Sequence, residues 1–260
     1  MLGTSYPNLR GKHRHKAVIN PDHFLRYESE QGRKPQFGVP KGIIFSYSSK
    51  LLQYIIDHHG AEKVENFFGA GDLYLLKSTN KRIGVVANFG IGSPVAVALL
   101  EELIAFGVRR FISIGYAGTP QPHIKAGDLI VCDRAIRDEG TSRHYTKASK
   151  YAYASDELTQ IIKNTMEADH QKYVVGTSWT IDAPYRETVK EIKKYQKEGV
   201  VAIEMEAAAL FAVAKFRGVD MGAMFSVSDS LADLKWDPQF HMSEESMKAL
   251  FHCAKEALIR

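Results

Sequence analysis

Cysteine and long apolar runs are both scarce in this sequence of 260 residues. Its two cysteines, Cys132 and Cys253, cannot build a disulfide framework, and they favour a reducing, cytoplasmic compartment. No apolar run approaches the roughly 20 residues that a membrane-spanning helix needs, so we expect no membrane association. Neither a zinc-ligand spacing nor a His-Glu-x-x-His motif occurs, and we expect neither a metal ion nor another bound cofactor.

An excess of charge of one sign is also lacking. The 34 basic and 30 acidic residues leave a net charge of +4, and this balance argues against a nucleic-acid partner. The basic residues between Arg10 and Lys16 alternate with histidines and form no long block. We interpret residues 1–37 as an N-terminal tail and lead-in segment, followed by one domain over residues 38–260.

Apolar runs of strand length alternate with helical patterns along most of the chain. This rhythm predicts an α/β domain with a largely parallel sheet and helices on both faces. The predicted strands cover residues 42–45, 82–87, 110–114, 128–132, 173–178, 200–204 and 221–227. The predicted helices cover residues 50–59, 95–106, 157–169, 184–198, 206–217 and 244–259.

Acidic residues and glycines follow several of the predicted strands. Glu206 comes directly after the strand at 200–204, and Asp229 comes after the strand at 221–227. The carboxyl ends of successive parallel strands lie at the edge where open α/β sheets bind ligands. The segments 115–118 and 90–92, both rich in glycine, should reach the same edge. We therefore expect a polar pocket in which Glu206 and Asp229 meet, although 23 positions separate them.

Each of these features also has a purely structural explanation. A glutamate at a helix start interacts favourably with the helix dipole, and an aspartate there is a common N-cap. The turn Gly-Ile-Gly at 90–92 is typical of a tight turn. It does not complete a G-x-G-x-x-G fingerprint, because Val95 occupies the third glycine position. A nicotinamide-dependent oxidoreductase is therefore disfavoured.

Five sequence motifs narrow the choice of function. They are VAIEMEAAA at 201–209, SD at 228–229, QPHIKAGD at 121–128, RDEGTS at 137–142 and TIDAPYRET at 180–188. Together they resemble the nucleoside phosphorylase superfamily, from about residue 38 to the C-terminus. The resemblance implies a three-layer α/β/α single domain around a mixed, partly barrel-like sheet. It also implies a homo-oligomer, either a dimer or a trimer of dimers.

Members of this superfamily cleave the N-glycosidic bond of a nucleoside, with phosphate in the phosphorylases and with water in the nucleosidases. The resemblance implies that Asp229 is the acid that protonates N7 of a leaving purine. It implies that Glu206 accepts hydrogen bonds from the ribose 2′- and 3′-hydroxyls, and that Met205 packs under the ribose. Glu204 and Ser228 are expected to contact and position these residues without touching the ligand themselves. The base-binding residues implied are Tyr116, Ala117, Gly118, Trp179 and Tyr185.

The base expected from the resemblance is a purine. Uridine phosphorylases carry an arginine near the strand end that bears Asp229, and no arginine follows Val227 here. Trp179 fits two interpretations equally well, a stacking partner for the base or a residue of the core.

The phosphate site departs from the family pattern. The implied phosphate contacts are Ser46, Lys50, Gly90 and Ser113, and Ser113 stands where phosphorylases carry an arginine. A buried dianion needs paired cations, and one lysine is a poor substitute for several guanidiniums. The resemblance implies a pentosyltransferase that cleaves by phosphorolysis, with inorganic phosphate as the co-substrate. Hydrolysis, or nucleoside binding without turnover, is the alternative, and no acid lies within residues 46–52 to activate water.

Overall fold

The centre of the molecule is a mixed β-sheet that closes on itself. The computed structural model describes residues 9, 11–33, 37–67 and 69–260. Five strands form a ring, because β5 pairs with β10, β10 with β6, β6 with β8, β8 with β9, and β9 again with β5. These strands are β5 (Arg110–Thr119), β6 (Leu129–Asp138), β8 (Tyr173–Ile181), β9 (Ala202–Glu204) and β10 (Asp220–Ser230).

A second group of strands extends the sheet outward from β5. β1 lies parallel to both β5 and β4, and β3 and β2 continue the sheet in antiparallel pairs. β7 pairs with β6, and β11 pairs with the end of β10. These strands are β1 (Gly42–Ser46), β2 (Ala61–Lys63), β3 (Asp72–Leu76), β4 (Ile83–Ala87), β7 (Tyr151–Tyr153) and β11 (Asp237–Pro238).

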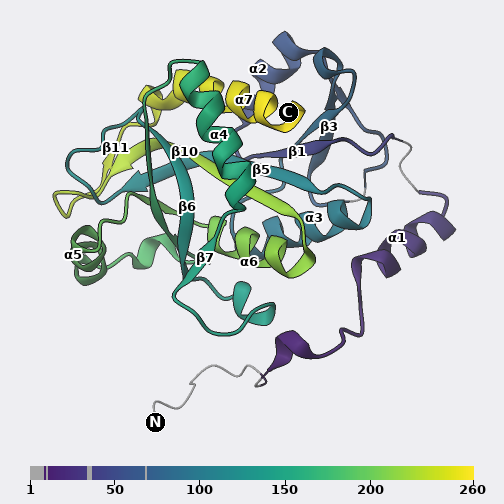
Figure 1. Ribbon diagram of the computed structural model, residues 1–260, viewed down its shortest axis with the longest axis horizontal. Helices are drawn as coiled ribbons and strands as arrows, with labels where there is room; N and C mark the ends of the chain where they lie inside the picture. Colours follow the sequence, from purple (N-terminus) through teal and green to yellow (C-terminus); the bar gives the residue numbers. More distant parts are fainter. Residues whose placement is uncertain (1–8, 10, 34–36, 68) are drawn as a thin grey trace.

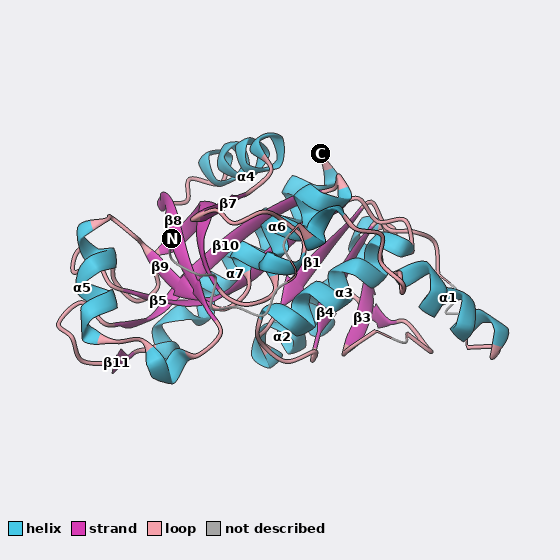
Figure 2. Cartoon of the chain, turned by 90° about the horizontal axis from the view of Figure 1, so that it is seen from below, coloured by secondary structure: helices cyan, strands magenta, loops and turns pink. Residues whose placement is uncertain are grey.

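Helices cover both faces of the sheet, as Figures 1 and 2 show. α2, α4 and α7 bury their apolar residues on one face, and α3 and α6 bury theirs on the other. α5 covers the cluster around Trp179 at one end of the ring. The helices are α1 (Pro21–Glu30), α2 (Ser49–His59), α3 (Ser93–Ala105), α4 (Asp156–Ala168), α5 (Val189–Lys197), α6 (Ala207–Arg217) and α7 (Glu244–Ile259). The predicted three-layer arrangement with a barrel-like sheet is confirmed.

Short 3-10 helices connect several of these elements. They cover Lys12–Arg14, Lys77–Thr79, Ser142–His144, Pro184–Arg186 and Phe240–Ser243. The expected N-terminal tail over residues 1–37 lies partly outside the described residues. Within it, α1 contacts α3 but stands clear of the sheet (Figure 1). Lys12 contacts the Nδ1 atom of His144 at 2.6 Å, so this arm reaches the body of the molecule.

Several predicted boundaries differ from the structure for local reasons. β5 continues through Gly115 to Thr119, because β10 pairs with it along its whole length. The helix predicted over residues 184–198 is interrupted, and α5 begins only at Val189. There the Oγ1 atom of Thr188 accepts a hydrogen bond from the backbone N–H of Glu191, and the Glu191 carboxylate bonds back to Thr188. This capping box starts a new helix, so the preceding residues form a separate turn.

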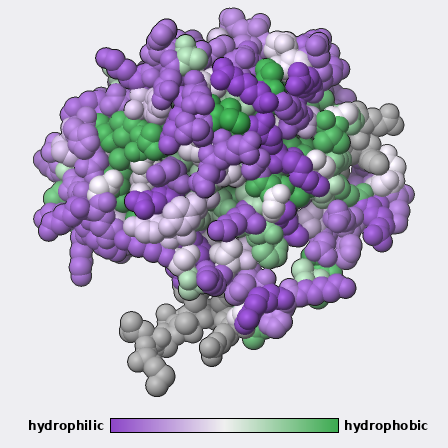
Figure 3. All heavy atoms as spheres, in the orientation of Figure 1, coloured by the Kyte–Doolittle hydropathy of each residue, from purple (hydrophilic) through white to green (hydrophobic). Residues whose placement is uncertain are grey.

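The surface is mostly hydrophilic on the face shown in Figure 3, with apolar side chains in separate patches. Across the described ranges, no helix combines the length and the apolar character that crossing a bilayer requires.

The interior of α4 offers a test of the packing. Ile162 is fully buried, and its Cδ1 atom lies 2.7 Å from where a Cβ atom on Gly222 would stand. We expect Ile162→Ala to lower the free energy of unfolding by about 2–5 kcal/mol, because a cavity would remain. The matched change Ile19→Ala, at a side chain that is 77% exposed, should cost less than about 0.5 kcal/mol. Urea denaturation of both variants measures the difference, and equal losses would contradict the assignment of Ile162 to the core.

Candidate active site

Residues at the carboxyl ends of β5, β9 and β10 surround a cavity of about 670 Å³. Glu206 reaches it from the connection between β9 and α6, and Asp229 from the end of β10. The structure thus brings together the two side chains whose meeting the sequence predicts. The other predicted residues that line this cavity are Tyr116, Ala117, Gly118, Tyr185, Glu204, Met205 and Ser228.

Glu206 is buried and lies opposite the start of α3. Its Oε1 atom accepts a hydrogen bond from the backbone N–H of Gly92, and Ser93 Oγ donates to the carbonyl of Met205 at 2.7 Å. Gly92 has a φ of +102°, a conformation that favours glycine. Burial raises the pKa of Glu206 to about 8, and the neighbouring Glu204 adds to this effect. The glycine turn at 90–92 therefore positions the carboxyl group expected to hold the sugar.

Glu204 is also buried, and four donors surround its carboxyl group. Its Oε1 atom accepts hydrogen bonds from Ser178 Oγ at 3.0 Å and from Thr180 Oγ1. Its Oε2 atom accepts from the backbone N–H groups of Glu206 and Ala207, at 2.8 and 2.7 Å. Burial raises the pKa of Glu204, while these hydrogen bonds act in the opposite direction. Glu204 therefore fixes the turn that carries Met205 and Glu206.

Asp229 turns toward the cavity because β10 contains a β-bulge at Ser228. The pairing register with β5 shifts between Val227 and Asp229, and such a shift re-aims the side chains that follow. Asp229 Oδ1 accepts a hydrogen bond from Ser228 Oγ at 2.7 Å, and Oδ2 accepts one from Trp236 Nε1 at 3.0 Å. A Cβ atom on Gly118 would lie only 3.0 Å from Asp229 Oδ2, so glycine leaves room for the carboxyl group.

Sequence reasoning missed several residues that line the cavity, among them Glu187 and Trp236. Burial raises the pKa of Glu187 to about 7, and the negative charge of Asp229 contributes to the increase. Glu187 belongs to the motif TIDAPYRET, which could have identified it, but the expected helix over 184–198 hid its position. Trp236 stands seven positions after Asp229, and only the return of the chain along β11 brings it back.

The structure places Trp179 in the core and not in the cavity. Its side chain is fully buried, its Nε1 atom donates to Asp138 Oδ2 at 3.0 Å, and its ring lies 4.6 Å from that of Tyr195. The base-binding interpretation of Trp179 is therefore wrong, because β8 directs this side chain under α5. Tyr185 does line the cavity, but it is 99% exposed at the mouth.

The four predicted phosphate contacts do not line the cavity. Lys50 points away and pairs with Glu244 at the surface, while Ser46 and Ser113 are buried behind the cavity wall. Gly90 belongs to the turn before α3, where Gly92 and not Gly90 contacts the site. This grouping is wrong, because Lys50 lies on the outer side of α2 and finds an acidic partner on α7.

Tyr47, and none of the four predicted phosphate contacts, forms part of the cavity wall. It lines the cavity, and Ser113 Oγ donates to its hydroxyl at 3.3 Å. Its Cδ2 atom lies 3.2 Å from where a Cβ atom on Gly115 would stand, so the ring rests on the glycine of β5. Burial raises the pKa of Tyr47 well above its ordinary value, and the negative charge of Glu206 adds to the increase. An uncharged phenol therefore borders the cavity on the side of Glu206.

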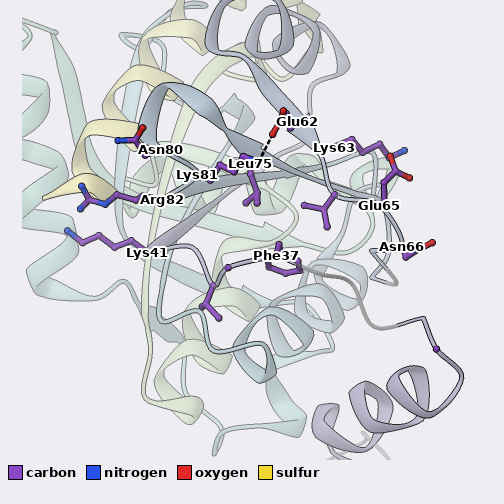
Figure 4. Close-up of a pocket in the computed structure, with 14 residues that line it drawn as sticks. Phe37, Lys41, Glu62, Lys63, Glu65, Asn66, Leu75, Asn80, Lys81 and Arg82 are labelled. Carbon is purple, nitrogen blue, oxygen red and sulfur yellow. Dashed lines mark ion pairs between the residues drawn. The ribbon is translucent and has the colours of Figure 1, made fainter.

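A second hollow, of about 970 Å³, lies at the other edge of the sheet (Figure 4). Three of its charged side chains form exposed ion pairs, in which Glu62 binds Lys77 and Lys81 and Lys63 binds Asp72. None of the residues that the sequence analysis singled out for chemistry lines this hollow, so the cavity around Glu206 and Asp229 is the candidate site. Within the described residues, no three His, Cys, Asp or Glu side chains converge as metal ligands.

Comparison with known proteins identifies the family of this chain. The model of the Phosphorylase superfamily matches residues 43–258. The chain belongs to this superfamily. The chain is similar to a guanosine phosphorylase of Halorubrum lacusprofundi, with 33% identity over 147 residues. That alignment covers 56% of the present chain and 61% of the guanosine phosphorylase, so the chain spans about three fifths of this relative.

Two solved structures share the fold of this chain. A uridine phosphorylase of Vibrio fischeri has a TM-score of 0.71 at 28% identity, over 85% of this chain and 91% of that one. An AMP nucleosidase of Bacteroides thetaiotaomicron has a TM-score of 0.74 at 21% identity, over 92% and 97% of the two chains. The likeness to the nucleosidase concerns the fold alone.

The raised pKa of Glu206 makes stability depend on pH. The folded-state pKa of about 8 exceeds the ordinary value of 4.5, so the favourable contribution is complete below about pH 4.5 and is lost as pH rises through 8. We expect Glu206→Gln to remove this loss, which corresponds to roughly 4 kcal/mol between pH 5 and pH 9. Urea denaturation from pH 5 to pH 9 measures it.

The control for this prediction is Glu65→Gln, which changes the same side-chain type at an exposed position. Its stability should follow the wild-type curve. If Glu206→Gln lost as much stability as the wild type between pH 5 and pH 9, the assignment of a protonated Glu206 would be wrong.

Proposed function

We propose that the protein cleaves the N-glycosidic bond of purine ribonucleosides. The observation that carries the proposal is the convergence of Glu206 and Asp229 on one cavity, from two different strand ends. One carboxyl group faces the place for a sugar and the other the place for a base. The reaction needs no bound cofactor, because carboxyl groups supply both the proton for the leaving base and the hydrogen bonds that orient the sugar.

On the base side, Asp229 is the general acid. Cleavage leaves an anionic purine, and a proton delivered to N7 makes that base a better leaving group. Glu187 lies close enough to Asp229 for their charges to interact, and both line the cavity. A carboxylate there accepts the N1–H of a 6-oxopurine such as guanine or hypoxanthine. The name of the guanosine phosphorylase relative supports this base class.

On the sugar side, Glu206 in its ionised form accepts hydrogen bonds from the 2′- and 3′-hydroxyls. Two such bonds to one carboxylate orient the ribose. The N–H of Gly92 already holds one oxygen of Glu206, so its position is fixed before the ligand arrives. Since the pKa of free Glu206 is about 8, nucleoside binding at pH 7 should release a proton.

The acceptor that the site favours is water. Lys235 is the one cationic side chain among the described residues that line the cavity, and it lies on the loop beside Asp229. The phenol of Tyr47 borders the sugar side, where a phosphate dianion would need cations. Phosphorolysis is the second candidate, favoured by the names of the guanosine and uridine phosphorylase relatives.

The assembly we propose is a cytoplasmic homo-oligomer. Apolar side chains at the mouth of the cavity are exposed, including Ile91, Val189 and Phe240. Exposed apolar groups clustered around a site are typical of a surface that a partner covers. A neighbouring subunit would shield the reaction from bulk solvent.

Replacement of the acid tests the chemical assignment. We expect Asp229→Asn to lower kcat for release of hypoxanthine from inosine by about 10²–10⁴-fold, because an amide cannot deliver the proton. Nucleoside binding, measured by calorimetry, should change little, since Glu206 remains. The matched control is Asp233→Asn, an exposed residue of the same loop that does not line the cavity. Wild-type rates in Asp229→Asn would remove the acid role.

The sugar product identifies the acceptor. With inosine as substrate, we expect free ribose as the sugar product. The rate of base release should be the same with and without phosphate at about 10 mM, because the cavity holds no pair of cations to bind a dianion. Chromatography of the sugar distinguishes ribose from ribose 1-phosphate. Ribose 1-phosphate together with a rate that requires phosphate would establish phosphorolysis instead. Release of no base from any purine nucleoside would end the proposed function itself.

A further inference from the structure

Trp236 occupies an unusual position for a tryptophan. Its side chain is 65% exposed, yet its indole N–H donates a hydrogen bond to Asp229 Oδ2 at 3.0 Å. It lies on the loop that joins β10 to β11 at the mouth of the cavity. A large exposed aromatic ring gains little from packing, so this hydrogen bond is what ties the indole to Asp229.

The loop that carries Trp236 is anchored at both ends. β11 pairs Pro238 with Asp229 and Asp237 with Ser230, and Gln196 Nε2 donates to the carbonyl of Ala232 at 2.8 Å. Between these anchors, Leu234 has a φ of +60°, which is unfavourable for a leucine. The backbone thus keeps Trp236 near Asp229, while the exposed indole has room to turn away.

The indole N–H contacts Asp229 at the cavity that both residues line. Ser228 Oγ donates to Oδ1, and the absence of a side chain at Gly118 leaves room beside Oδ2, the oxygen that accepts from Trp236. A purine whose N7 shares a proton with Asp229 reaches the carboxyl group from this same cavity.

We propose that Trp236 is a specificity-determining residue that favours purines, because its indole N–H holds on Asp229 the position that N7 of the base takes. The inference rests on the proposed function of this site. A purine breaks the indole contact and replaces it with a hydrogen bond in which Asp229, protonated from solvent, donates to N7, because N7 of a nucleoside can only accept. A pyrimidine has no ring nitrogen at that place, so it breaks the contact and leaves Asp229 without a replacement. An unreplaced hydrogen bond to a charged group weakens binding roughly ten-fold to one-hundred-fold.

Removal of the N–H donor tests this selection. In Trp236→Phe, water takes the open position on Asp229, and water can remain beside a small pyrimidine. We expect the ratio of kcat/KM for inosine to that for uridine to fall about ten-fold or more. Trp236→His, which keeps a ring N–H donor, should restore part of the ratio. Tyr153→Phe, at an exposed aromatic residue outside the cavity, should leave the ratio unchanged.

Intrinsic fluorescence follows the contact itself. The chain has two tryptophans, and Trp179 is fully buried and does not line the cavity. Titration of the wild type with hypoxanthine should therefore change the emission of Trp236, and titration of Trp236→Phe should leave the emission flat. Uracil at the same concentrations should change the wild-type emission much less.

The two proposals fail in different ways. If the wild type releases base from inosine but Trp236→Phe keeps the wild-type ratio while remaining folded by circular dichroism, Trp236 does not select the base and the proposed function stands. Equal emission changes with hypoxanthine and uracil would overturn the selection as well. If the wild type releases no base from any nucleoside, the proposed function fails, and the titrations with free bases still show whether a purine displaces Trp236.

Discussion

The site depends on the burial of two carboxyl groups, Glu204 and Glu206, at one turn. Taking a carboxylate out of water costs several kcal/mol unless hydrogen bonds replace the lost solvent. The fold supplies four donors to Glu204 and one backbone N–H to Glu206. The two groups are therefore treated differently. Protein donors satisfy the carboxyl group of Glu204, while Glu206 keeps acceptor positions for a ligand, and burial raises the pKa of both groups.

Closure of the sheet into a ring brings the rest of the chemistry to this turn. β9 pairs antiparallel with β5 through Gly118 and Ile203, so the end of β9 lies against the strand that also flanks Asp229. In an open sheet of parallel strands, these strand ends would line one edge in sequence order. The ring instead places residues from β5, β9 and β10 around a single cavity. The bulge at Ser228 then turns Asp229 inward.

The electrostatic character of the cavity follows from the same construction. Carboxyl groups from three segments, Glu187, Glu206 and Asp229, line this space, and among the described residues that line it Lys235 is the one cation. Burial raises the pKa of Glu187 to about 7, with the charge of Asp229 adding to the increase, and burial raises the pKa of Glu206 to about 8, with the charge of Glu204 adding to it. A neutral nucleoside, rich in donors at its sugar and at N1, complements such a cavity better than an inorganic dianion does.

The sequence by itself determined the fold class, most element positions and the convergence of Glu206 and Asp229 on one cavity. Those features come from local periodicity and from the rule that parallel strand ends share an edge, and both are readable without coordinates. Only the tertiary structure decided the places of Trp179, Lys50, Glu187 and Trp236. Which face of β8 or α2 a side chain takes depends on what packs against it. Trp236 contacts Asp229 because β11 folds back onto β10, a pairing between segments that carry no local signal for it.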